Sequence, residues 1–310
     1  MSSYAKGTRK PKRGQMIKEI KIGGFKVMPG TAITALLAAL YVLFLAGIKL
    51  ESGSDAVTLS IFSLVIFILL DYAVRAGRLP GLKPFVVLID AFLALMALAS
   101  VWEIFVFLGV INLSGLSGPI KPVLIAIASA ALSLVLIYGV LYYTRGKLMD
   151  SKFDDIYARI GDKKGIAIGL AGLIICLILG TGIVYVLYGG STKVTGSLPS
   201  LLAFALVFAI LSAAYEELWF RGLLLSRMIE LAGEASANLI QAVVFGVFEA
   251  LAVYTITSQP LYLPVFLVVG GILGYYWGKM TLEDKSLLSP ALLHAGLYVL
   301  IGLPIMASML

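Results

Sequence analysis

The sequence predicts an all-α fold, a polytopic transmembrane helical bundle of about nine spans with its N-terminus inside. Of the 310 residues, 60% are hydrophobic and only 13% are charged, against about 25% charged residues in soluble domains. The mean hydropathy is +1.02. Apolar stretches of the length needed to cross the hydrocarbon core, about 20 residues, recur along the whole chain. These observations exclude a soluble globular domain.

Nine apolar stretches account for the predicted spans. The third and the sixth are long enough to be tilted, broken or extended beyond the membrane. The predicted spans cover residues 31–50, 55–77, 84–112, 119–144, 165–189, 198–228, 235–257, 261–279 and 287–308.

The net charge of +7 follows the membrane topology. Eight Lys or Arg residues precede the first span, and on alternate loops only Lys49, Lys121 and Lys193 carry positive charge. Cytoplasmic loops are enriched in Lys and Arg, so we expect a cytoplasmic N-terminus and an outside C-terminus in a plasma or inner membrane. The basic tail is expected to contact anionic membrane lipids, and no nucleic-acid partner is needed to explain the charge.

The chain divides at its one extended polar linker. Residues 1–30 form a basic cytoplasmic tail, residues 31–144 a four-span unit, and residues 165–310 a five-span core. Within the linker, residues 145–164, apolar side chains recur at helical spacing, which predicts a short amphipathic helix on the membrane surface. These side chains are Phe153, Ile156, Tyr157 and Ile160.

The acidic residues of the four-span unit are interpreted as structural. Asp71 is four residues from Arg75, which predicts an ion pair. Asp90 is expected to meet Lys83 or water, and Glu103 has no partner predicted from the sequence.

Two features of the five-span core are also interpreted as structural. Cys176 is the only cysteine, so no disulfide forms within the chain, and a lone buried cysteine behaves as a small hydrophobic residue. Gly270, Gly274 and Gly278 lie on one face of the eighth span, where small residues let helices approach closely. Packing within the bundle is favoured over a dimer interface.

The sixth span carries charged residues in the stretch Tyr215–Leu224. An ionisable side chain within the bilayer costs at least about 2.5–3.5 kcal/mol on insertion scales and normally faces a bundle interior. Glu217 and Arg221 have the favourable spacing and order for a helical ion pair, but Glu216 has no partner on this helix. A functional centre is favoured over the alternative, a structural ion-pair cluster that holds helices together.

Two more deep polar residues lie in neighbouring spans. Glu249 is in the seventh span, and His294, the only histidine, is in the ninth. Two glutamates and a histidine could activate a water molecule for attack on a carbonyl, hold a divalent metal with a bound water, or carry protons in a transporter. Spacing alone leaves these three open, although the two halves of the chain lack the matched interrupted helices of an inverted-repeat transporter.

The motifs of these spans resemble those of the CPBP family of intramembrane proteases. This family includes the CAAX-processing and bacteriocin-processing proteases, the abortive-infection proteins and the type II CAAX prenyl endopeptidase. The resemblance covers about residues 198–310 and rests on Glu216-Glu217-x-x-x-Arg221-Gly222, on Phe245 in the next span, and on Ser-Pro-x-x-x-His294.

The resemblance implies a helical-bundle endopeptidase that cleaves membrane-associated peptides or proteins near the cytoplasmic side. It implies that Glu216 is the general base that activates water, that Glu217 and Arg221 brace the site, and that His294 polarises the scissile carbonyl or helps bind a metal.

Two positions depart from the family pattern. The family has histidine where this chain has Glu249, and asparagine or aspartate where it has Tyr298. Glu249 could serve as a second carboxylate that shares a proton with Glu216, with Tyr298 donating a hydrogen bond to an oxyanion. Alternatively, Glu216, Glu249 and His294 could bind a metal such as zinc, or the protein could be a catalytically inactive scaffold that binds membrane partners. Whether the chain is an enzyme therefore stays open at this point.

Overall fold

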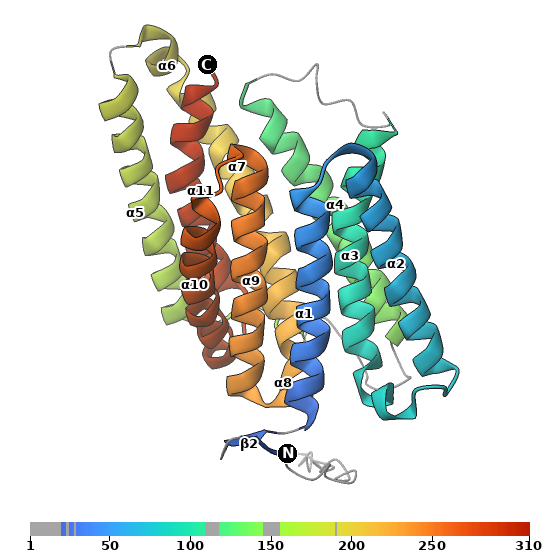
Figure 1. Ribbon diagram of the computed structural model, residues 1–310. Coiled ribbons are helices and arrows are strands. Elements are labelled where there is room, and N and C mark those ends of the chain that lie inside the picture. Colours follow the sequence, from blue (N-terminus) through green and yellow to red (C-terminus); the bar gives the residue numbers. More distant parts are fainter. Residues whose placement is uncertain (1–19, 23–24, 28, 109–117, 145–155, 190) are drawn as a thin grey trace, which may run out of the picture.

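The computed structural model describes all residues except 1–19, 23–24, 28, 109–117, 145–155 and 190, and it shows a bundle of long helices (Figure 1). Nine helical segments among the described residues are long and apolar enough to cross a membrane. The chain is therefore an integral membrane protein with the all-α bundle that its composition predicts. The first of these helices begins at one end of the bundle, and the chain ends at the other (Figure 1).

The elements follow the predicted spans closely. They are β1 (Ile20–Ile22), β2 (Phe25–Val27), α1 (Pro29–Leu50), α2 (Gly53–Arg75), η1 (Pro80–Phe85), α3 (Val86–Phe107), α4 (Ile120–Thr144), α5 (Lys163–Tyr188), α6 (Thr192–Gly196), α7 (Leu198–Glu217), η3 (Leu218–Leu225), α8 (Ser226–Ala232), α9 (Glu234–Thr257), α10 (Tyr262–Asp284) and α11 (Leu288–Ser308).

The two long predicted spans are both irregular. The third begins with the 3₁₀ segment η1, where prolines at positions 80 and 84 interrupt the α-helical pattern before α3. The sixth is a 35-residue helix from Leu198 to Ala232. Its middle section, η3, is a π-helix that joins α7 to α8.

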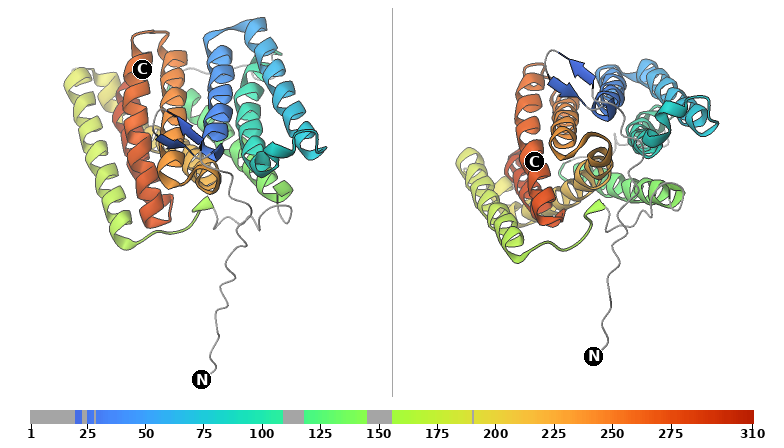
Figure 2. Two further views of the ribbon diagram at one scale, coloured as in Figure 1. Left: turned by 60° about the horizontal axis from the view of Figure 1, so that its bottom comes forward. Right: turned by 90° about the horizontal axis from the view of Figure 1, so that it is seen from below.

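Helices of the two predicted units pack against each other. Helix α1 contacts α9 and α8 as well as α2 and α3, and α4 contacts α7. On the far side of the bundle, α5 lies at the periphery beside α11 (Figure 2). One apolar core contains residues of both units, including Phe92 of α3 and Phe220 of η3. The five C-terminal spans are thus supported on one side by the N-terminal helices.

The glycines of α10 provide the close contact between α10 and α9. A Cβ on Gly270 would lie 3.1 Å from the Cα of Gly246, and a Cβ on Gly274 would lie 3.2 Å from the Cα of Ala242. A Cβ on Gly278 would overlap Oδ1 of Asn238, whose Nδ2 donates a hydrogen bond to the carbonyl of Tyr275 at 3.0 Å. The prediction that this glycine face packs within the bundle is confirmed.

Three acidic residues of the N-terminal unit, Asp71, Asp90 and Glu103, form ion pairs, and two of these pairs join different helices. The predicted pair exists, because Arg75 Nε donates to Asp71 at 2.7 Å. Asp90, for which Lys83 or water was expected, pairs with Arg75, whose Nη2 donates to it at 2.6 Å. One guanidinium therefore joins the end of α2 to the start of α3. Glu103, for which no partner was predicted, accepts a hydrogen bond from Lys49 at 2.6 Å.

The predicted tail and linker lie partly outside the described residues. Of the tail, β1 and β2 form an antiparallel pair. Of the linker, residues 145–155 lie outside the described residues, and with them Phe153. Residues 156–162 form a turn and irregular chain rather than an α-helix, so the predicted amphipathic helix is wrong where Ile156, Tyr157 and Ile160 lie.

Hydrogen bonds hold this irregular segment, residues 156–162, against the turn between α10 and α11. Leu287 N donates to the carbonyl of Tyr157 at 3.1 Å, and Ser286 Oγ donates to the carbonyl of Arg159 at 2.6 Å. The segment also explains a motif residue, because a Cβ on Gly222 would lie only 3.2 Å from the carbonyl oxygen of the buried Ile156.

Candidate active site

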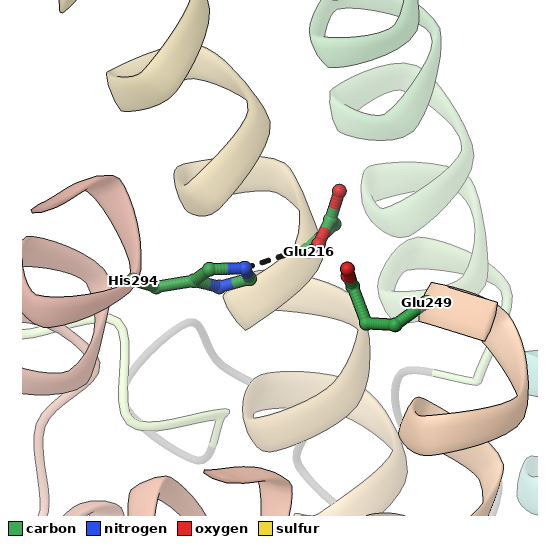
Figure 3. A group of neighbouring side chains, drawn as sticks. All are labelled: Glu216, Glu249 and His294. Carbon is green, nitrogen blue, oxygen red and sulfur yellow. Dashed lines mark ion pairs between the residues drawn. The ribbon is translucent and has the colours of Figure 1, made fainter. Parts of the chain in front are cut away.

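Three polar side chains from three helices converge inside the bundle. Glu216 comes from the end of α7, Glu249 from α9 and His294 from α11, and they point toward one another (Figure 3). Each offers one ligand atom, and these atoms all lie within 4.8 Å of one another. Glu216 and His294 are only 3% and 1% exposed, and Glu249 is half-buried. The residues selected from the sequence thus meet at one point.

The paired glutamates stand where the sixth span changes its helical form. Glu216 and Glu217 are the last residues of α7, and the π-helix η3 begins at Leu218. π-Helical turns are rare and occur frequently at functional sites. Arg221 lies in this segment, and its Nη1 donates to Glu217 Oε1 at 2.9 Å, with both side chains almost fully buried. The predicted Glu217–Arg221 ion pair is confirmed.

The ion pair orients the histidine. His294 Nδ1 lies 2.9 Å from Glu217 Oε1, and Glu217, paired with Arg221, is a carboxylate that can only accept. Nδ1 therefore carries the hydrogen, and Nε2 is the nitrogen that faces Glu216, 3.5 Å from its Oε2. A carboxylate that fixes the tautomer of a histidine in this way is common to catalytic and metal-binding histidines.

Aromatic rings enclose the histidine and the arginine. The indole of Trp277 stacks on His294 with ring centroids 4.4 Å apart, and Phe245 meets the same imidazole edge-on at 5.5 Å. The Arg221 guanidinium lies over the Phe245 ring, 4.0 Å from its centroid, a cation–π contact that favours a desolvated cation. Phe245, expected from the motif, thus contacts both Arg221 and His294. Trp277 was missed because nothing in its spacing marks it.

Tyr298 faces the carboxylates. Its hydroxyl oxygen lies 2.8 Å from both Oε1 and Oε2 of Glu216 and 3.0 Å from Oε1 of Glu249. The sequence suggested that this phenol would donate to an oxyanion; the structure shows it bound to two glutamates. The two positions that depart from the family pattern, 249 and 298, are therefore in direct contact.

The donor set is chemically suited to a divalent metal. Two carboxylates and one imidazole could hold zinc with a water in the fourth position, and the Nδ1 contact to Glu217 is the support that a ligating histidine usually has. In charge terms, Arg221 balances Glu217, which leaves Glu216 and Glu249 to be balanced by a metal, by protons or by an imidazolium.

The fold and this centre together define a polytopic helical membrane protein with a buried glutamate–histidine site. Residues 197–300 match the family model described as type II CAAX prenyl endopeptidase Rce1-like, in agreement with the CPBP family. The matched segment is about a third of the chain and contains every residue of the site. The predicted resemblance is thereby confirmed for this segment. No curated protein and no solved structure matches the chain.

Proposed function

We propose that this protein is an intramembrane endopeptidase that hydrolyses a peptide bond of a membrane-associated peptide or protein, with Glu216 as the base that activates water. The observation that supports this is the convergence of Glu216, Glu249 and His294 within 4.8 Å, together with the orientation of His294 by Glu217. Hydrolysis of a peptide bond requires a base that activates water and a group that polarises the scissile carbonyl, placed close to one another. Glu216 and His294 are placed in this way.

The reaction assigns a role to each group. The Glu216 carboxylate takes a proton from water as the water oxygen bonds to the scissile carbonyl carbon. His294, protonated on both nitrogens, donates from Nε2 to the oxyanion that forms, and the Glu217 carboxylate stabilises this imidazolium. When the carbon–nitrogen bond breaks, the proton held by Glu216 passes to the leaving amine. The carboxylate is then restored.

A metal would change the source of the electrophile. If zinc bound to Glu216, Glu249 and His294, it would supply Lewis-acid polarisation and a more acidic water. Glu217 and Arg221 would still hold His294 by its Nδ1 side, so the orienting role of the ion pair is the same with or without the metal.

The matched family model suggests the first substrates to test. The purified protein in liposomes would be given peptides ending in a CAAX sequence, each in a farnesylated and an unmodified form. We expect Glu216→Gln to lower the rate of cleavage by about 10²–10⁴-fold, the usual contribution of a general base. Glu283→Gln is the matched control, because Glu283 is 64% exposed at the end of α10. Equal cleavage by wild type and Glu216→Gln would refute the assignment.

The second candidate is a catalytically inactive scaffold for membrane partners. One observation favours it: both oxygens of Glu216 contact the Tyr298 hydroxyl, so the base is already hydrogen-bonded within the protein. This alternative predicts that Glu216→Gln leaves the cellular function intact and that a constant membrane partner co-purifies with both forms. A peptide cut by the wild type and spared by Glu216→Gln would rule it out.

A further inference from the structure

We propose that the candidate active site opens toward the end of the bundle at which α11 finishes, through a water-filled groove that admits an extended, apolar segment of the substrate. The groove begins at Glu249 and Tyr298 and runs along α9 and α11. Its role in substrate entry rests on the proposed endopeptidase function, whereas its existence does not. The family resemblance implies cleavage near the opposite end, the expected cytoplasmic side, at which α1 begins (Figure 1).

One face of α11 carries His294 and changes from buried to exposed along the helix. Pro290, one turn before His294, is buried. Tyr298, one turn after it, is half-buried, and the next residues on this face, Ile301 and Ile305, are 36% and 38% exposed. Residues three or four apart share one face of a helix. The face that points into the site is therefore closed near the beginning of α11 and open toward its end.

Helix α9 shows the same change along the face that carries Glu249. Gln241 and Phe245 precede Glu249 at intervals of four residues and are 0% and 1% exposed. Ala252, three residues after Glu249, is half-buried, and Thr255 is exposed. Because only one span, α10, lies between α9 and α11 in the chain, these two helices run in the same direction. Both faces thus open toward the same end of the bundle.

Side chains of η3, α8 and α10 close the opposite side of the site. Leu224 and Met228 are 0% exposed, and Trp277, which stacks on His294, is 5% exposed. The segment η3 contacts α8, α9 and α10. Toward the other end the sixth span is α7, which packs mainly on α11 and α4. The π-helical segment therefore fills the bundle beside α9 on one side of the site only.

The polar groups at both ends of the groove favour water over lipid as its content. Glu249 lies in the middle of α9 and is only half-buried, and an ionisable side chain at this depth normally faces a bundle interior or a water-filled cavity. Tyr298 is also half-buried and contacts Glu249 and Glu216. At the mouth of the groove, Thr255 and Ser308 are exposed. Water can therefore reach the carboxylates from this end.

The walls of the groove are apolar. Ile301 and Ile305 lie on α11, and the ring of Phe208 of α7 packs beside them, 5.7 Å from that of Tyr298 and 3.8 Å from the position of a Cβ on Gly302. Non-helical backbone is tolerated at membrane depth where it lines a water-filled cavity. The water in the groove meets this condition, and the walls favour apolar side chains. An extended, apolar peptide segment is the occupant that fits.

Thiol labelling tests the groove without any substrate. Cys176 is the only cysteine, so Cys176→Ala provides a background for single cysteines. Ile301→Cys and Ile305→Cys report on the groove, and Ser289→Cys reports on the closed side, because Ser289 is 0% exposed. Ile183→Cys is the matched lipid-facing control, since Ile183 is a 39% exposed isoleucine of the peripheral helix α5. A charged reagent attacks thiolates that water can reach, so both groove cysteines should react at least about tenfold faster than the other two.

Labelling of sealed vesicles with the same impermeant reagent decides which end is open. Leu261→Cys marks the proposed end, because Leu261 is 74% exposed between α9 and α10. Glu283→Cys marks the other end, because Glu283 is 64% exposed near the end of α10. Ile301→Cys should react in the vesicle orientation in which Leu261→Cys reacts. Its labelling should also abolish peptide cleavage, because the bound reagent blocks entry, whereas labelling of Leu261→Cys should leave cleavage unchanged.

Three results would overturn the proposal. Groove cysteines that react as slowly as Ile183→Cys would show that this face meets lipid. Fast reaction of Ser289→Cys in the orientation of Glu283→Cys would show that the site opens at the opposite end. Cleavage that survives labelling of Ile301→Cys would show that the substrate enters elsewhere. If no form cleaves any peptide, the proposed function fails, and the thiol labelling still decides where the site opens.

Discussion

Replacing Glu217 by glutamine should destabilise the protein strongly, although the change is nearly isosteric. Glu217 and Arg221 are both 0% exposed and joined at 2.9 Å. Removing one partner of a buried ion pair leaves the other charge uncompensated and typically costs about 3–5 kcal/mol. The carbonyl oxygen of glutamine can still accept hydrogen bonds from His294 Nδ1 and Arg221 Nη1, so the loss reports mainly on the charge of Arg221, which Glu217 would no longer balance.

The free energy of unfolding would be measured by denaturant titration in mixed micelles, followed by tryptophan fluorescence. The double variant Glu217→Gln/Arg221→Met removes both charges, and we expect it to be more stable than Glu217→Gln alone. Glu283→Gln is the control, because it breaks a pair of the same i,i+4 spacing at 3.8 Å on the exposed surface, where such pairs contribute about 0.5 kcal/mol or less. A loss below about 1 kcal/mol for Glu217→Gln, or a double variant whose loss equals the sum of the single losses, would refute the reasoning.

Three further predictions concern other parts of the molecule. Gly278→Ala should lower the free energy of unfolding by about 1–3 kcal/mol, because its Cβ overpacks the α9–α10 contact at Asn238. The control is Gly139→Ala, whose added Cβ meets no atom within 4 Å and which should change the same quantity by about 1 kcal/mol or less. Burial, with Glu234 and Glu230 nearby, raises the pKa of the Tyr157 hydroxyl above its usual value. The stability that this shift contributes is present below about pH 10 and is lost as the pH rises through the folded-state pKa. The free energy of unfolding of the wild type should therefore fall more at alkaline pH than that of Tyr157→Phe. Equal pH dependence of the two proteins would contradict this. If Glu216 and Glu249 share a proton, chelators should leave peptide cleavage unchanged. Activity that is lost on chelation and restored by zinc would show instead that the two carboxylates bind a metal.

The sequence predicts those features that depend on local spacing. Among the described residues, hydropathy over about 20 residues locates each candidate membrane-spanning helix to within about five residues. The i,i+4 rule finds the Asp71–Arg75 and Glu217–Arg221 pairs. The family motifs also select the residues that meet at the site. Each of these signals lies within one helix or one motif.

The remaining features depend on how distant helices pack. Arg75 reaches Asp90 because α2 and α3 are antiparallel neighbours, and spacing along the chain does not show this packing. Trp277 lies on the face of α10 that contacts α9, and no periodicity shows that it stacks on His294. The contact between Glu249 and Tyr298 joins residues 49 positions apart, so two departures from the family pattern that look independent in the sequence form one hydrogen bond.

The most direct test of the central claim is a single turnover of the wild-type protein in water enriched in heavy oxygen. If Glu216 activates water, mass spectrometry of the product should show one heavy oxygen in the new C-terminal carboxylate, and Glu216→Gln should yield no product on the same timescale. Product formed equally by Glu216→Gln, or no product from any of the membrane-associated peptides, would contradict a glutamate-activated hydrolysis.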